Sequence, residues 1–195
     1  MKPKRQGIVF LKGRKVVLRP LNKKTDLEAC CRWVNDPTVR QYISTTFPTS
    51  IHQEEKWFDD LPNRKDEIVF GIETIGGKII GVISLVHIKW HDRTATTGAM
   101  IGDKRYWGKG YGTDAKMILL DYAFNQLNLR KICSAVFSFN KRSLRYNLRC
   151  GYKIEGRLKK QMFKNGKYRD NILLAVLKKD WLPIWHKYQK TGNVK

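Results

Sequence analysis

Acidic residues are scarce in this sequence. Of its 195 residues only 17 are Asp or Glu, whereas 39 are Lys or Arg, which leaves a formal net charge of +22. Such a surface attracts anions, so the expected partners are nucleic acid, a phosphorylated ligand or an acidic surface. A polycation is a poor partner, because binding one requires an acidic pocket and few carboxylates are present to build it.

Long apolar runs and clustered metal-ligand residues are also lacking. No segment approaches the about 20 apolar residues of a membrane helix, and the first residues do not lead into the apolar region of a signal peptide. The four cysteines, at positions 30, 31, 133 and 150, form no C-x-x-C pair and have no clustered histidines. These absences predict a cytoplasmic protein with reduced thiols, no membrane contact and no metal site.

No linker, low-complexity segment or internal repeat divides the chain. The composition is 42% hydrophobic and 11% aromatic, enough for a sizeable core. We therefore expect a single domain over residues 1–195, with a core at about 8–182 and frayed basic ends at Met1–Arg5 and Lys187–Lys195.

The order of strand and helix patterns predicts a mixed α/β (α+β) domain. Strand patterns cover residues 7–21, 68–74, 78–86, 94–102 and 131–136, followed by a hairpin with a turn at Asn165-Gly166. Helix patterns cover residues 25–36 with Thr25 as cap, 50–61 with Ser50 as cap, 113–127 and 142–149.

A glycine-rich turn, Trp107-Gly108-Lys109-Gly110-Tyr111-Gly112-Thr113-Asp114, lies between a predicted strand and the longest predicted helix. Its glycines allow backbone N–H groups to converge just before the helix N-terminus, which predicts an anion-binding cradle. The turn is not a P-loop, because it lacks the G-K-[ST] ending, and it does not match the dinucleotide-binding fingerprint.

With this turn the sequence resembles the GCN5-related N-acetyltransferase (GNAT) superfamily, specifically the branch of the Rim-type (RimJ/RimL-like) ribosomal-protein N-terminal acetyltransferases. The family loop reads [Q/R]-x-x-G-x-[G/A]; with Gly110 and Gly112 as its glycines, Trp107 takes the Q/R place. The segment Arg105–Gly110 also matches this pattern, in a register that begins two residues earlier. The resemblance extends to Leu18-Arg19-Pro20-Leu21, Trp33-Val34-Asn35-Asp36-Pro37, Asn140-Lys141-Arg142-Ser143 and the segment 150–157.

The resemblance implies the GNAT fold, with a mixed central sheet of about seven strands flanked by about four helices, and acetyl-CoA as acyl donor. Backbone amides from Gly108 to Thr113 would hold the diphosphate at the positive end of the long helix. The implied acetyl-CoA-binding residues are Met100, Ile101, Trp107, Gly108, Lys109, Gly110, Tyr111, Gly112, Thr113, Asn140 and Ser143.

Two positions depart from the pattern that the family uses for catalysis. Thr96 stands where many relatives have a Glu that acts as base, and Asn147 stands where many have a Tyr acid. Ser143 is the expected catalytic contact to the thiol sulfur, although a serine near a helix N-terminus also commonly bonds its own backbone.

Other candidates for a base are weak. Glu73, His87 and His91 lie on or beside central strands, where a lone histidine is more often structural. An acceptor with a pKa near 8, such as a protein α-amino group, could lose its proton to water, unlike a lysine or polyamine nitrogen above 10. The favoured acceptor is therefore a protein N-terminal α-amine of the ribosomal-protein type, or a small amine such as an amino sugar or antibiotic.

The expected acceptor wall comprises Arg40–Ser50, Trp90 and the hairpin Phe163–Tyr168. The charge also suggests association with the ribosome or RNA. The sequence is compatible with a homodimer. The alternative is a basic nucleic-acid- or ribosome-binding module without catalysis. Tyr106, Trp107 and Tyr111 interleave with basic residues as such modules require, but the basic residues spread through the whole chain.

Overall fold

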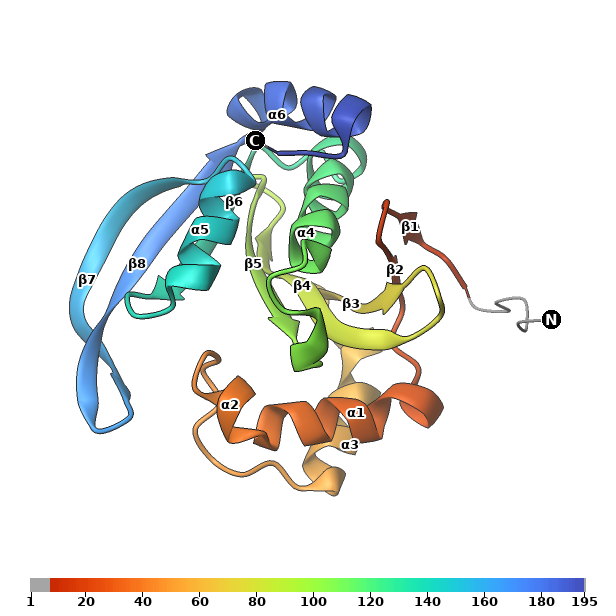
Figure 1. Ribbon diagram of the computed structural model, residues 1–195, viewed down its shortest axis with the longest axis vertical. Coiled ribbons are helices and arrows are strands. Elements are labelled where there is room, and N and C mark those ends of the chain that lie inside the picture. The colour runs from red at the N-terminus through yellow and green to blue at the C-terminus, as the bar shows by residue number, and fades with distance from the viewer. Residues whose placement is uncertain (1–7, 195) are drawn as a thin grey trace.

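The computed structural model describes residues 8–194, which form one mixed sheet with helices around it (Figure 1). The strands, eight rather than about seven, stand in the order β1-β2-β3-β4-β5-β6-β8-β7. They are β1 (Leu11–Lys12), β2 (Val16–Arg19), β3 (Ile68–Thr74), β4 (Ile79–Lys89), β5 (Thr94–Ile101), β6 (Lys131–Phe137), β7 (Lys153–Lys164) and β8 (Lys167–Leu177). The predicted α/β class is confirmed; the predicted first strand is two short antiparallel strands.

The helices are α1 (Lys23–Asn35), α2 (Pro37–Arg40), α3 (Ile51–Asp60), α4 (Tyr111–Asp121), α5 (Lys141–Arg149) and α6 (Lys178–Thr191). The last turn of the predicted helix 113–127 is the π-helical turn η3 (Tyr122–Gln126). Short α2 and C-terminal α6 were not predicted. Within residues 8–194, no helix has the length and apolar character needed to cross a membrane.

Of the two predicted N-caps, the one of α3 is confirmed and the one of α1 is wrong. Ser50 and Gln53 form the reciprocal capping box of α3, so the predicted start is confirmed. In α1 the cap is Asn22, whose side chain accepts a hydrogen bond from the backbone N–H of Lys24 at 2.9 Å. The prediction of Thr25 as cap was wrong, because Thr25 already lies inside the first helical turn.

Helix α6 corrects the expectation that the chain frays from Lys187. Trp181 is fully buried and Tyr188 is 5% exposed, and both belong to the main hydrophobic core. This aromatic face holds the helix in place through Thr191, so the core extends beyond residue 182. The other predicted frayed end, Met1–Arg5, lies outside the described residues.

The two central strands β5 and β6 run parallel but part early. Their register contains only the pairs Thr94↔Lys131, Ala95↔Ile132 and Thr96↔Cys133. Just beyond the last pair, the Thr97 hydroxyl donates to the Cys133 carbonyl at 3.2 Å. Farther along, β5 stays paired only with β4 and β6 only with β8, so their facing edges diverge. The resulting gap lies beside α4 and α5 (Figure 1).

The buried carboxylate of Asp114 attaches the first turn of α4 to the β1–β2 turn. It accepts the backbone N–H groups of Arg14, Lys15 and Val16 at 3.1, 2.6 and 2.9 Å. The Tyr188 hydroxyl donates to the same carboxylate, which brings in α6. One side chain therefore connects three segments that are distant in sequence and fixes where α4 begins.

We expect Asp114→Asn to lower the free energy of unfolding by about 2 kcal/mol or more, because an amide nitrogen cannot accept the backbone N–H groups that the carboxylate accepts. Urea denaturation measures this loss. Tyr188→Phe removes one donor only and should cost about 1 kcal/mol. Equal stability of wild type and Asp114→Asn would contradict the anchoring role.

Candidate active site

A cavity of about 770 Å³ opens where β5 and β6 part. Of the eleven residues expected to bind acetyl-CoA, the structure brings nine to its wall: Met100, Ile101, Trp107, Gly108, Gly110, Gly112, Thr113, Asn140 and Ser143. They come from the end of β5, the glycine-rich turn, and the starts of α4 and α5. Lys109 and Tyr111 do not line the cavity.

The glycine-rich turn adopts a conformation that suits an anion. Gly108 and Gly110 have φ angles of 73° and 84°, which side-chain-bearing residues rarely adopt. Gly110 precedes α4 and provides no capping side chain, so the first N–H groups of the helix stay available. Gly112 and Thr113, in the first turn, face the cavity. This is a helix N-terminus open to a phosphate.

Lys109 and Tyr111 contribute to the outer side of the turn instead. The carbonyl of Lys109 accepts a hydrogen bond from Lys15 Nζ at 2.9 Å. The Tyr111 ring packs edge-on against Tyr106 and has Lys15 Nζ 5.6 Å from its centroid. The β1–β2 turn thus clamps the glycine-rich turn from outside the cavity.

Trp107 connects the end of β5 to α5 at the cavity wall. Its Nε1 donates to the Ile101 carbonyl at 2.6 Å, and the Arg142 guanidinium lies 3.8 Å from its ring centroid. The carbonyl of Ile101, the last residue of β5, is therefore already hydrogen-bonded to the indole. The backbone of Gly98–Met100 is the part of this strand that can still bond a ligand. Stacking on Trp107 also holds Arg142 at the cavity.

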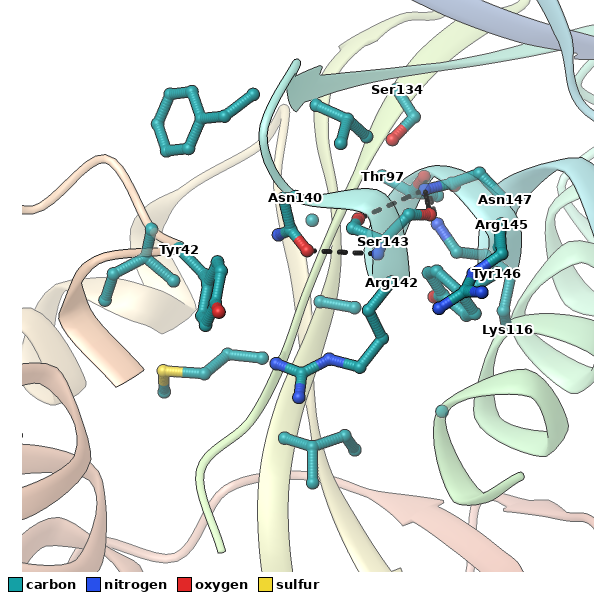
Figure 2. Close-up of a pocket in the computed structure, with 18 of the residues that line it drawn as sticks. Tyr42, Thr97, Lys116, Ser134, Asn140, Arg142, Ser143, Arg145, Tyr146 and Asn147 are labelled. Atoms are coloured by element: carbon teal, nitrogen blue, oxygen red, sulfur yellow. Dashed lines mark hydrogen bonds between the residues drawn. The ribbon is translucent and has the colours of Figure 1, made fainter. Parts of the chain in front are cut away.

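Helix α5 and its N-cap present three polar side chains, Asn140, Ser143 and Asn147, to the cavity (Figure 2). Asn140 caps the helix, since its Oδ1 accepts the Ser143 backbone N–H at 3.1 Å, and only its amide NH₂ is left to donate. Asn147 Nδ2 donates to the Ser143 carbonyl at 2.9 Å and approaches Ser143 Oγ at 3.4 Å. Ser143 Oγ accepts from Asn147 Nδ2 and donates to no acceptor among residues 8–194, so its proton can point to a ligand.

Asn147 also has an acceptor atom that needs a donor. The residue is 1% exposed, and among residues 8–194 no donor reaches its Oδ1. A buried unpaired amide oxygen is costly, and the pantetheine arm of coenzyme A carries amide N–H groups that could satisfy it. The residues present therefore fit acetyl-CoA.

The candidate bases lie elsewhere. Thr96 is not in the cavity wall; its neighbour Thr97 is. Glu73 pairs with Arg19, which also bonds Asp26, and so belongs to a buried ion-pair cluster between β2, β3 and α1. His87 and His91 are exposed and outside the cavity wall.

Sequence reasoning missed the cationic side of the cavity. Lys116, Arg142, Arg145 and Arg149 line it, and no Asp or Glu of the described chain does. The arginines are three and four residues apart and so share one face of α5. This spacing is visible in the sequence and could have predicted a basic helix face. Lys116 stands one turn after Gly112, but nothing local predicts that its side chain is buried.

The predicted acceptor wall is only partly in place. Tyr42, Ile43 and Ser44 line the cavity, and the hairpin contributes Met162 and Asn171 rather than the predicted residues of its turn. Phe163, Tyr168 and Trp90 are all more than half exposed and lie outside the wall. Lys164 Nζ donates to the Thr45 carbonyl at 3.0 Å, so the hairpin and the α2–α3 segment close this side together.

A family model of the acetyltransferase (GNAT) domain matches residues 15–153. The chain belongs to the GNAT acetyltransferase family. It is 36% identical over 182 residues to the Bacillus subtilis protein named probable N-acetyltransferase YjcK, covering 88% of this chain and 98% of that one. It is 29% identical over 167 residues to Escherichia coli K12 spermidine N(1)-acetyltransferase, covering 86% and 88%.

Among solved structures, spermidine N-acetyltransferase from Vibrio cholerae in complex with CoA and spermine superposes on this acetyltransferase with a TM-score of 0.81. The two chains are 27% identical, with 86% of this chain and 98% of that chain covered. The GNAT fold is confirmed, and the protein is an acetyl-CoA-dependent N-acetyltransferase. The Rim-type branch stays a prediction. Residues 8–194 contain no group of three or more His, Cys, Asp or Glu side chains that could hold a metal ion.

We expect Gly110→Val to weaken acetyl-CoA binding at least about tenfold, the equivalent of one charge-assisted hydrogen bond. A Cβ here would meet only the end of the Lys15 side chain, with Nζ at 3.5 Å and Cε at 3.8 Å, so the cause is the φ angle of +84°, which valine cannot adopt without moving the amides. Calorimetric titration measures the affinity.

Gly166→Val is the matched control. Gly166 has a φ angle of +73° with open space around it, but it lies in the β7–β8 turn. It should cost stability without changing acetyl-CoA affinity. If both variants bind acetyl-CoA as wild type does, the glycine-rich turn is not the phosphate site.

Proposed function

We propose that this acetyltransferase holds the diphosphate of acetyl-CoA at the glycine-rich turn and the N-terminus of α4, and the pantetheine between β5 and β6. The observation that carries this proposal is the coincidence of three features at one cavity. These are left-handed glycines before an uncapped helix, two strands with unpaired facing edges, and a buried Asn147 oxygen that no donor among residues 8–194 reaches.

The proposed acceptor is a primary amine that is not a polycation: a protein N-terminal α-amine of the ribosomal-protein type, or a small amine such as an amino sugar or antibiotic. The support is electrostatic, because the described wall of the cavity has four basic residues and no acidic one. In a shared cavity a polyamine would meet like charges, which disfavours binding.

A polyamine is the second candidate, because two of the relatives reported above are spermidine acetyltransferases. The alternative from the sequence, a nucleic-acid- or ribosome-binding module without catalysis, was wrong, because the chain belongs to an acetyltransferase family. Association with the ribosome or RNA through the net charge of +22, and a homodimer, remain proposals from the sequence.

The proposed chemistry is direct attack of the neutral amine on the thioester carbonyl. Among the described residues that line the cavity there is no Asp, Glu or His, so the acceptor would lose its first proton to solvent. Ser143 Oγ, held near Asn147 Nδ2, would donate a hydrogen bond to the sulfur as the C–S bond breaks.

A thiol-release assay with an acceptor panel tests the acceptor class. With short peptides bearing a free Ser or Ala α-amine, an amino sugar and spermidine as acceptors, we expect kcat/KM for spermidine to be at least about tenfold below the best other acceptor. This factor corresponds to about 1.4 kcal/mol of repulsion in the transition state. Spermidine as the best acceptor would contradict the proposal and support the second candidate.

Ser143→Ala should lower kcat about tenfold, the value of one hydrogen bond to a developing charge, with little change in acetyl-CoA affinity. The acidic limb of the pH profile should shift when the acceptor is exchanged for one of different pKa. Thr96→Ala is the control, because Thr96 lies outside the cavity wall, and its kcat should stay within about twofold of wild type. An acidic limb that stays fixed across acceptors would reveal an enzyme base.

A further inference from the structure

Lys116 is a buried lysine at the wall of the acetyl-CoA cavity. It is 1% exposed and comes from the second turn of α4, one turn beyond the proposed phosphate site. Figure 2 places it next to Tyr146 and Asn147, on the opposite side of the view from Tyr42. A fully buried lysine is rare without an acidic partner, and within residues 8–194 no Asp or Glu bonds to this one.

The contact that holds Lys116 is the point where β5 and β6 part. Lys116 Nζ donates to Thr97 Oγ1 at 2.5 Å. The same hydroxyl lies 2.9 Å from the Tyr152 hydroxyl and donates its own proton to the Cys133 carbonyl. Because this proton is used, Tyr152 and Lys116 both act as donors to Thr97. The amine is thereby fixed at the inner end of the gap between the strands.

The groups around the Lys116 amine leave it as the only one that titrates near neutral pH. Nζ lies 5.3 and 5.1 Å from the ring centroids of Tyr146 and Tyr152. Burial raises the pKa of Cys150 to about 12 and also raises the pKa values of Tyr146, Tyr152 and Cys133, so these neighbours stay neutral. Burial lowers the pKa of Lys116 to about 7.

Beyond Thr97 no described residue accepts a proton from the Lys116 amine. The Tyr146 hydroxyl, on the facing side of α5, is likewise buried without a hydrogen-bond partner among residues 8–194. Both groups lie at the wall of the same cavity. The Lys116 amine carries three protons and has one bonded acceptor among residues 8–194, so a polar or charged ligand atom at this end of the cavity could accept another.

The geometry points to Lys116 as the proton donor for the departing thiolate of coenzyme A. This role deepens the proposed function, since Asn147 replaces the tyrosine that would otherwise be the acid. It requires only that the acyl end of acetyl-CoA reach the inner end of the gap between β5 and β6, where Thr97 holds the amine.

Acetyl transfer with Lys116 as the acid forms one bond to the carbonyl carbon and breaks one. The acceptor nitrogen forms a bond to the thioester carbonyl carbon, and the C–S bond breaks with its electron pair on sulfur. Lys116 Nζ passes one proton to that sulfur and becomes a neutral amine. The new amide nitrogen loses its extra proton to water, and water returns a proton to Lys116, which gives acetamide product and CoA thiol.

Bound CoA provides a test that needs no acceptor. A protonated Lys116 beside the sulfur favours the thiolate, and a neighbouring thiolate in turn favours the protonated lysine, so the onset of thiolate formation should shift toward neutral pH in the wild-type complex relative to Lys116→Met. Thiolate absorbance in the ultraviolet, recorded as a pH titration of the CoA complex, measures this shift. Lys153→Met, which removes an exposed lysine paired with Asp180, is the matched control and should titrate as wild type.

Kinetics with the best acceptor of the panel provide the second readout. Because the acid must carry its proton, wild-type kcat/KM for acetyl-CoA should fall as pH rises through about 7, the pKa of Lys116 in the free protein. In Lys116→Met we expect kcat to fall at least about tenfold and this basic limb to disappear, with acetyl-CoA affinity retained.

Folding is monitored separately. A lysine whose pKa is lowered in the folded state binds fewer protons there than in the unfolded chain, so wild-type stability should rise with pH above about 7. Lys116→Met should have the higher Tm at acidic pH, and the difference should shrink as pH rises. The proposal is wrong if the pH titration of the CoA thiol and the basic limb of the pH–rate profile are the same in wild type and in folded Lys116→Met. That result would leave the acetyl-transfer activity itself unaffected.

Discussion

The separation of β5 from β6 is the constraint on which the rest of this structure depends. Each strand keeps its antiparallel neighbour on one side, but their shared edge has only three residue pairs before it opens. Backbone N–H and C=O groups that lack a partner inside a protein must be satisfied by another group. A ligand with its own amides, such as the pantetheine of acetyl-CoA, suits such an opening.

The helices around the gap are placed by contacts both outside the cavity and at its wall. Asp114 fixes the first turn of α4 against the β1–β2 turn and α6, and Lys15 fastens the glycine-rich turn. Trp107 joins the end of β5 to Arg142 on α5. A site assembled from segments so far apart depends on the whole sheet, so changes far from the cavity can alter it.

The charge of the protein acts at two levels. The excess of basic residues produces a general attraction for anions, which suits a coenzyme with three phosphates. Within the cavity the same bias is local, since only basic charges line its described wall. Spermidine acetyltransferases are among the relatives of this chain, and in the function proposed above this basic wall is the feature that would disfavour a polycation as acceptor.

The sequence by itself determined the features that depend on neighbouring residues: the Asn165-Gly166 hairpin, the Ser50 cap, and the glycine-rich turn before a long helix. Turn and cap geometry arise from local backbone preferences, so they can be read along the chain. Only the tertiary structure decided that Lys116 is buried against Thr97, and that α6 packs rather than frays. Burial and its effect on a pKa are set by residues that are distant in sequence and meet only in the folded chain.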